Sequence, residues 1–313
     1  MLTKIKPYLA VMRLDHWFKN SFIFVGTFLA IYFFNIDLNI NNILLIVLSF
    51  LFSSFISSVN YIINEILDAK YDKFHPEKKF RPIPSGKAKV KYLLVIIFIL
   101  LVFSILGSYL IFSKYFLISI IMLLFSGIIY NVPPIRVKEI PFLDVLAESF
   151  NNPIRLLIGW FTFQSISTFP PLSILLAFWF FGALLMAGKR YSEYKFLNDK
   201  EMAGAYRKSF KFYSEKILII SMVVYANLLF FFIGVFMVSY NKNLIFSLPF
   251  IIGEIIIYFN LTFENKKLIR EPEKIYKHPL FILYNIALLI IIYICLHLPA
   301  DLTAKLNFFK LLK

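Results

Sequence analysis

The sequence predicts an all-α integral membrane protein with nine transmembrane helices. The 313-residue chain is 60% hydrophobic, has a mean hydropathy of +0.76 and contains 38 phenylalanines, more apolar surface than one globular core can bury. Nine apolar runs are about as long as a bilayer requires. Lysine and arginine gather in alternate connections between these runs. We therefore expect one transmembrane domain over residues 1–313 and no soluble domain.

The nine runs define the expected helices in order along the chain. The first run follows basic residues, as a signal peptide does, but FNIDLN comes after it in place of small residues for cleavage, so we expect it to be retained. The fifth run is interrupted by polar residues and is the weakest. The runs fall near 20–36, 42–64, 91–112, 115–132, 143–163, 171–188, 217–239, 243–262 and 280–299.

The basic residues predict the orientation. With this helix order, 27 lysines and arginines lie on the side of the amino terminus, five lie on the other side, and Arg155 lies inside a run. By the positive-inside rule the amino terminus is cytoplasmic and the carboxyl terminus is outside. The net charge of +15 follows the membrane and does not indicate nucleic-acid binding. The single Cys295 allows no internal disulfide and is expected to fill apolar space.

A stripe of polar residues marks the end of the second run. Asn60, Asn64, Asp68 and Asp72 are spaced by four, so on a helix they share one face, and Glu65 lies beside them. Carboxylates and carboxamides are oxygen ligands that suit Mg²⁺, which usually shares its shell with substrate phosphates. The stripe therefore predicts a site for Mg²⁺ and a diphosphate.

A second stripe lies in the fifth run, FLDVLAESFNNPIRLLIGW. Asp144, Glu148 and Asn152 are spaced by four and Arg155 follows three residues later. Ionisable groups inside a membrane normally face the bundle interior and mark a functional path. Pro153 is expected to kink the helix and widen such a cavity. A structural charge network or a transport path is the alternative interpretation of both stripes.

Basic residues follow the acidic stripes. HPEKKFRPIPSG (75–86) supplies Lys78, Lys79 and Arg81 in a chain that proline stiffens, and YNVPPIRVK (130–138) supplies Lys138. Acids for a metal ion and bases for phosphate are thus expected at one membrane face, at the cytoplasmic leaflet. The simpler interpretation makes these residues ordinary positive-inside charges.

These residues together resemble the UbiA superfamily of intramembrane prenyltransferases. The family's first motif, Asn-Asp-x-x-Asp-x-x-x-Asp, matches Asn64, Glu65, Asp68 and Asp72, with Glu65 in the place of an aspartate. Its second motif, two acids four apart, falls on Asp144 and Glu148. The resemblance implies nine helices bundled around a central cavity, with both motifs as the metal ligands that hold a Mg²⁺-diphosphate and Asp68, Asp72, Asp144 and Glu148 as the catalytic residues.

Within the superfamily, the chain is most similar to the decaprenyl-phosphate phosphoribosyltransferase branch. RLDHWFKN (13–20), HPEKKFRPIPSG and GKRYSEYKF (188–196) carry this similarity, which continues through AYRKSFKFY (205–213) to EPEK (271–274). In that branch the donor is phosphoribosyl diphosphate and the lipid phosphate is the nucleophile. YNVPPIRVK and DVLAESFNNPIRLLIGW (144–160) look closer to relatives that use prenyl diphosphates.

We therefore expect a Mg²⁺-dependent transferase that acts on a polyprenyl lipid and a diphosphate-containing donor. Phosphoribosyl transfer to a polyprenyl phosphate is the first hypothesis, prenyl transfer to an aromatic or other small acceptor is the alternative, and anion transport is the second alternative. An oligomer is possible. Arg155 is expected either to contact a substrate phosphate or to pair with Glu148. The expected substrate-binding residues are Asn60, Asn64, Lys78, Arg81, Lys138, Asn152, Arg155, Lys189 and Arg190.

Overall fold

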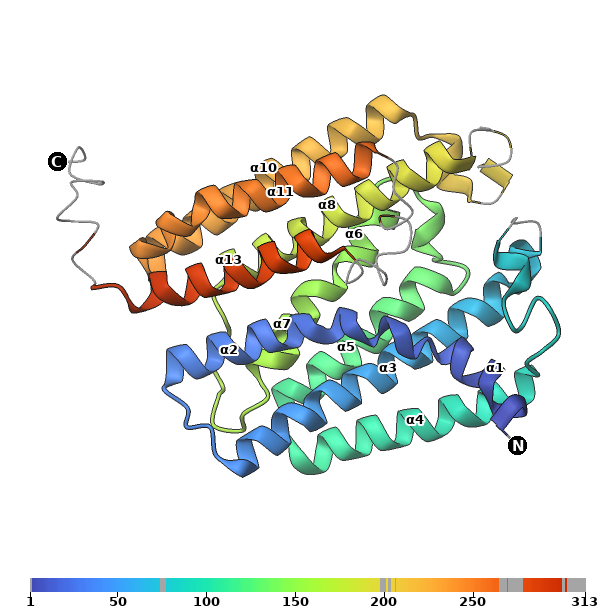
Figure 1. Cartoon of the computed structure of the whole chain (residues 1–313). Helices are drawn as coiled ribbons and strands as arrows, with labels where there is room; N and C mark the ends of the chain where they lie inside the picture. The colour runs from blue at the N-terminus through green and yellow to red at the C-terminus, as the bar shows by residue number, and fades with distance from the viewer. Residues whose placement is uncertain are drawn as a thin grey trace. The chain divides into compact units, whose positions relative to one another are not determined.

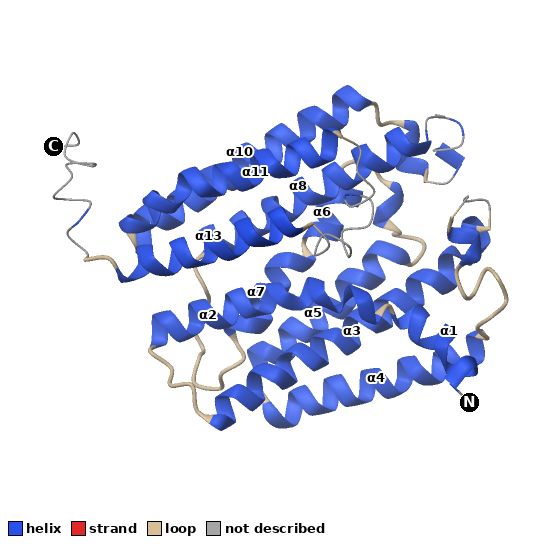
Figure 2. Cartoon of the chain, in the orientation of Figure 1, coloured by secondary structure: helices blue, strands red, loops and turns tan. Residues whose placement is uncertain are grey.

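A computed structural model of the chain describes residues 2–73, 77–197, 201, 204, 205, 207–264, 269, 278–299 and 302. All regular structure within these residues is helical (Figure 2). The chain divides into two compact units. The first contains Met1–Pro170 and Asp199–Tyr213, and the second contains Pro171–Asn198 and Ser214–Lys313.

The first unit is built around the longest helix, α3. Figure 1 shows α4 and α5 lying beside α3, with α1 crossing near its end. Val11, Val59, Ile62, Leu93 and Leu100 are buried together and join α1, α3 and α4. The elements of this unit are α1 (Leu2–Met12), η1 (Leu14–Ser21), α2 (Phe22–Phe34), α3 (Ile40–Asp72), η2 (Lys78–Phe80), α4 (Val90–Ile111), α5 (Lys114–Asn131), η3 (Val137–Glu139), α6 (Leu143–Ser149), α7 (Asn151–Trp160) and η4 (Lys208–Lys211).

The second unit is a set of long apolar helices. Its elements are α8 (Leu172–Leu197), α10 (Glu215–Tyr240), η5 (Lys242–Ser247), α11 (Leu248–Phe263) and α13 (Pro279–His297). Helix α8 packs against α10, and Tyr258 of α11 donates a hydrogen bond to the Leu185 carbonyl of α8 (2.8 Å). Buried Gly182, Ala183 and Ala187 keep the side of α8 narrow, which lets apolar helices approach closely in a membrane.

Side-chain caps set the beginnings of several helices. The side chain of Asn39 accepts a hydrogen bond from the Asn42 amide at the start of α3, and Ser113 and Ser214 cap α5 and α10 in the same way. Such caps satisfy amides that have no partner within the helix, which matters at the ends of apolar segments.

Eight spans are long and apolar enough to cross a membrane in the part of the chain that the structure describes. The fifth expected run, 143–163, is not among these eight spans. It forms two short helices, α6 and α7, that meet at Phe150. Pro153 lies just after this break, and because it has no N–H it leaves the preceding turn without one helical hydrogen bond. The first span also begins earlier than residue 20, since it covers Ile5–Phe34 and includes η1, α2 and most of α1.

Helix α7 packs directly on α2 through two glycines. A Cβ atom on Gly159 would lie 1.9 Å from the Ile23 carbonyl oxygen, and one on Gly26 would lie 2.1 Å from the Leu156 carbonyl oxygen. Thr27 donates a hydrogen bond to the Gly159 carbonyl (3.3 Å). Small residues allow this backbone contact, which holds the polar face of α7 inside the first unit.

Candidate functional site

The acidic end of α3 is bound to cations from the segment that follows α5. Asp68 accepts hydrogen bonds from Lys138 Nζ at 2.6 and 2.7 Å and from Arg136 Nη2 at 2.8 Å. Arg136 also donates to Glu139 (2.6 Å), which in turn pairs with Lys208 (2.6 Å). Acids and bases therefore alternate across this end of the first unit.

Lys138 is the centre of this arrangement. Its ammonium is buried and lies 3.0 Å from Asn131 Oδ1 in addition to both Asp68 oxygens. Asn64 of α3 is hydrogen-bonded to the same Asn131 side chain. Burial lowers the pKa of the Lys138 ammonium to about 8, although the Asp68 carboxylate acts to raise it. Three oxygens from two helices thus surround one positive charge.

Asp72 and Glu65 bind the loop between α3 and α4. Asp72 is 2% exposed and pairs with Arg81 Nη1 at 2.6 Å. Glu65 is also buried, and its Oε1 accepts the Ile83 amide at 3.1 Å. Both carboxylates therefore hold the proline-rich loop against α3.

In the second acidic pair, Asp144 is held by the segment before α10 and Glu148 is held by α5. Asp144 is fully buried and accepts hydrogen bonds from Tyr213 Oη (2.6 Å), Ser209 Oγ (3.3 Å) and Arg207 Nη1 (3.3 Å). Glu148, one turn further along, accepts from Tyr130 Oη at 2.8 Å.

The two acidic faces lie at the same end of the first unit. Arg207 Nη1 is also 3.4 Å from Tyr130 Oη, so one arginine joins both members of the second pair. Lys208, the next residue, reaches Glu139, which Arg136 connects to Asp68. The structure thus brings Asp68 into one network of ion pairs and brings Asp144 and Glu148 into a second network, and the neighbouring residues Arg207 and Lys208 join the two along the chain.

A separate polar cluster lies deeper along α7. Arg155 donates to Asn20 Oδ1 (2.8 Å) and to Asn152 Oδ1 (3.2 Å). Among the described residues its partners are these carboxamides, and Glu148 is not within ion-pair distance of it. Asn60 donates to the Leu123 carbonyl (2.9 Å) and lies against Gly127, so it fixes α3 to α5.

The remaining basic residues of the predicted site belong to other elements of the chain. Lys78 is in η2, and His75, three residues earlier in the sequence, falls outside the described residues. Lys189 and Arg190 belong to α8 in the second unit. Arg190 is buried and lies 3.6 Å from Glu193 of the same helix.

The donor atoms fit a hard divalent cation that is completed by a substrate. No group of three His, Cys, Asp or Glu side chains that could hold a metal ion occurs within the part of the chain that the structure describes. Mg²⁺ is commonly held by one or two carboxylates together with substrate phosphates and water. Asp68 and the carboxamide of Asn131 offer such oxygens around the position of the Lys138 ammonium, and Asn64 donates its side-chain amide to the same Asn131 oxygen. The larger predicted ligand set stays a prediction.

Sequence reasoning missed several residues of this network. Arg136, Asn131, Arg207, Lys208 and Tyr213 all contact the acidic pairs or their partners. Their signal was present, because YNVPPIRVK and AYRKSFKFY place two basic clusters beside the motifs. Which basic residue of each cluster turns toward an aspartate depends on the short η3 and η4 turns.

Comparison with known proteins shows what this chain is similar to. The profile of the UbiA prenyltransferase family matches residues 20–293. A decaprenyl-phosphate phosphoribosyltransferase of Mycobacterium tuberculosis (strain ATCC 25618 / H37Rv) is 29% identical over 178 residues, which are 55% of this chain and 54% of that protein. An uncharacterized protein of Sinorhizobium fredii is 28% identical over 155 residues, 50% of this chain and 28% of that protein. The chain therefore spans about half or less of these relatives.

Two solved structures share the fold. A UbiA homolog from Archaeoglobus fulgidus bound to GPP and Mg²⁺ superposes with a TM-score of 0.67 and 21% identity, over 90% of this chain and 99% of that one. A structure of digeranylgeranylglyceryl phosphate synthase gives a TM-score of 0.57 and 19% identity, over 94% of this chain and 97% of that one. At these identities the likeness concerns the fold alone.

Proposed function

The chain belongs to the UbiA prenyltransferase family, and from this premise we propose that it is a Mg²⁺-dependent intramembrane transferase acting on a polyprenyl lipid and a diphosphate donor. The observation that carries the proposal is the network in which Asp68, Asp144 and Glu148 meet Lys138, Arg136 and Arg207 at one end of the first unit. Metal-binding oxygens and phosphate-binding cations are what a diphosphate leaving group requires.

The network is suited to an exchange of partners. Each aspartate is neutralised by a basic side chain: Asp68 by Lys138, Asp72 by Arg81, and Asp144 by Arg207. A bound Mg²⁺-diphosphate brings cations for the carboxylates and anions for the basic residues at the same time. Buried charges that lose a partner are costly, and this exchange leaves none unpaired.

In the proposed reaction, the acidic residues, the basic residues and the apolar helices have different roles. Asp68 and Asp144, with Glu148 and the Asn64 carboxamide, would hold Mg²⁺, which when bound neutralises charge on the leaving diphosphate. Lys138, Arg136 and Arg207 stabilise the negative charge that grows as the carbon–oxygen bond breaks. Asp72 and Glu65 keep the loop with Arg81 closed over this end. The apolar helices bind the isoprenoid chain by area burial, roughly 25 cal/mol per Å².

The substrate that we propose is phosphoribosyl diphosphate, with a polyprenyl phosphate as the acceptor. The 29% identity to a decaprenyl-phosphate phosphoribosyltransferase supports it. Prenyl transfer from a polyprenyl diphosphate to a small acceptor is the second candidate, which the fold shared with a homolog bound to GPP favours. The same oxygen and cation groups serve both donors. The excess of lysine and arginine supports a site at the cytoplasmic leaflet.

A donor competition tests the proposal. The purified full chain in nanodiscs is supplied with Mg²⁺, polyprenyl phosphate and either labelled phosphoribosyl diphosphate or labelled geranylgeranyl diphosphate. We expect phosphoribosyl label in the lipid phase, release of diphosphate and loss of both with a chelator or in Asp144→Asn. Transfer of prenyl label to an added aromatic acid would favour the second candidate. No transfer from either donor, together with anion flux that needs no Mg²⁺, would indicate a transporter.

A further inference from the structure

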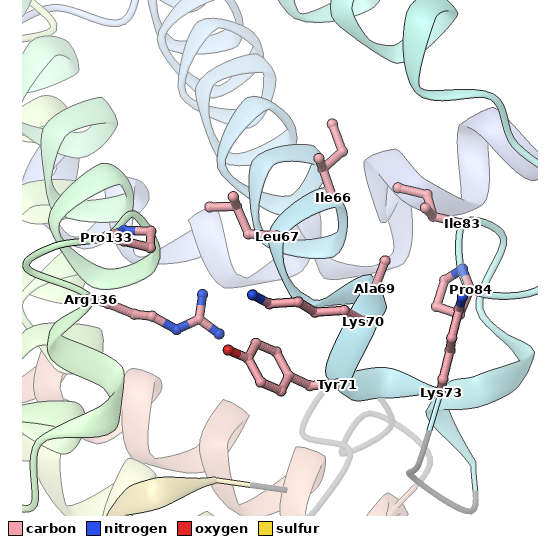
Figure 3. A pocket seen from close by; sticks show the side chains of 10 residues that line it. All are labelled: Ile66, Leu67, Ala69, Lys70, Tyr71, Lys73, Ile83, Pro84, Pro133 and Arg136. Atoms are coloured by element: carbon pink, nitrogen blue, oxygen red, sulfur yellow. The ribbon is translucent and has the colours of Figure 1, made fainter.

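A pocket of about 520 Å³ lies beside the acidic network, on another face of the α3 end. Leu67, Lys70, Lys73, Pro133 and Arg136 are among its lining residues, whereas Asp68 and Asp72 are not. Figure 3 shows these side chains around the space, with Lys70 and Arg136 pointing toward one another. From this pocket we propose that the protein binds the phosphate-bearing headgroup of an anionic membrane lipid here.

Two cations converge on one aromatic ring in this pocket. The Lys70 ammonium lies 4.9 Å from the centre of the Tyr71 ring, and the Arg136 guanidinium lies 5.2 Å from it. Like charges held this close repel one another, and an anion between them relieves that repulsion. The ring supplies a flat apolar wall, and cation–π contact orients both groups.

The positive charges that line the pocket outnumber the carboxylates that pair with them in the described part of the chain. Lys70 and Lys73 are exposed and form no ion pair with a carboxylate among the described residues. Arg136 pairs with Asp68 and Glu139, but these two acids also hold Lys138 and Lys208. The three cations Arg136, Lys138 and Lys208 therefore share the carboxylates of Asp68 and Glu139. Lys70 and Lys73 add two further positive charges at the pocket.

The lining indicates a lipid rather than a soluble anion. Ile66, Leu67, Ile83, Pro84 and Pro133 give the pocket apolar walls next to its charges. It lies beside the end of α3, whose apolar segment is long enough to cross a membrane, so we place the pocket at the level of the headgroups. Basic pockets between transmembrane helices at this depth bind anionic headgroups.

An apolar stripe on α5 leads away from the pocket. Ile118, Phe125 and Ile129 are exposed at 51%, 54% and 41%, and they lie on one face of the helix. Pro133, which lines the pocket, follows four residues after Ile129. A lipid with its headgroup in the pocket would lay an acyl chain along this stripe. The ligand that we propose is therefore a phospholipid.

Lipid retention tests the inference. The full chain is purified from mixed micelles that contain equal amounts of phosphatidylglycerol and phosphatidylcholine, and bound lipid is counted by native mass spectrometry. We expect selective retention of phosphatidylglycerol. In Lys70→Gln/Lys73→Gln the affinity should fall about 30-fold, since each basic residue contributes about 1 kcal/mol to anionic-lipid binding.

The matched control is Lys87→Gln/Lys89→Gln, which removes the same charge from exposed lysines that do not line the pocket. It should retain phosphatidylglycerol as the unmodified chain does. Equal loss in both variants would show a general surface effect and overturn the inference, as would full retention in the pocket variant. Displacement of the lipid by millimolar inorganic phosphate would instead assign the pocket to a soluble phosphate. Size-exclusion profiles confirm that both variants are folded.

Discussion

Replacing Tyr213 with phenylalanine removes one hydroxyl that joins the second acidic pair to its support. Tyr213 Oη donates to Asp144 Oδ1 (2.6 Å) and accepts from the Phe142 amide (2.6 Å). A hydrogen bond to a charged group contributes roughly 1.5–3 kcal/mol and one between neutral groups roughly 0.5–1.5 kcal/mol. Tyr213 is 1% exposed, so water does not replace the hydroxyl easily. We expect the free energy of unfolding to fall by about 2–4 kcal/mol.

The same change should also weaken metal-dependent turnover. Phe142, which immediately precedes α6, has a φ of 64°, a strained value for a residue with a side chain, and the Tyr213 hydroxyl helps to hold it there. Without this bond Asp144 is less well oriented, so half-maximal turnover should need about tenfold more Mg²⁺. Unfolding in mixed micelles and a Mg²⁺ titration measure the two effects, with Tyr109→Phe, 69% exposed, as the control. A Tyr213→Phe protein within about 0.5 kcal/mol of the unmodified one would refute the reasoning.

Three further predictions concern single positions. Asp68→Asn should abolish transfer while the protein still elutes as a folded species in detergent, and near-normal transfer would exclude Asp68 from the metal site. Gly159→Ala should cost about 1–3 kcal/mol or more because backbone of α2 blocks the new methyl group, whereas Gly234→Ala, with open space around it, should not destabilise; thermal unfolding separates them. Glu65→Asp should cost about 1 kcal/mol of stability because the shorter carboxylate no longer reaches the Ile83 amide, and an unchanged unfolding temperature would show that this bond is not needed.

The helices were predictable because their signal is local. The apolar runs of the sequence agree with α3, α4, α5, α8 and α10 to within a few residues at the majority of the helix ends. The resemblance to the UbiA superfamily is confirmed by the family match over residues 20–293. The break between α6 and α7 was harder to place, because the proline identifies a weak turn but not the residue at which the helix separates.

The partners of the acids could not be read from spacing. Helical periodicity places Asp68 and Asp72 on one face, but it does not say which cation meets each of them. Arg136 adopts a φ of 34° and Phe142 one of 64°, values that ordinary side chains seldom take. These two residues immediately precede η3 and α6, and they set the direction of the chain there. As a result Lys138 contacts Asp68, and Asp144 in the first turn of α6 contacts Tyr213. Such conformations depend on tertiary contacts and leave no pattern in the sequence.

The ion pairs explain how a membrane protein keeps these acids before any substrate arrives. An unpaired carboxylate in this setting costs several kcal/mol, so Asp68, Asp72 and Asp144 each need a cation in the resting protein. The cations that meet this need are also those that a diphosphate requires. Under the proposed function, the side chains that stabilise the protein without substrate, Lys138 and Arg207 above all, are also those that bind the substrate. A metal ion alone would displace these cations and leave them unpaired, whereas a metal ion with a diphosphate satisfies both sets of charges. If the proposed function holds, the site should therefore bind the metal ion and the diphosphate together more tightly than either one alone.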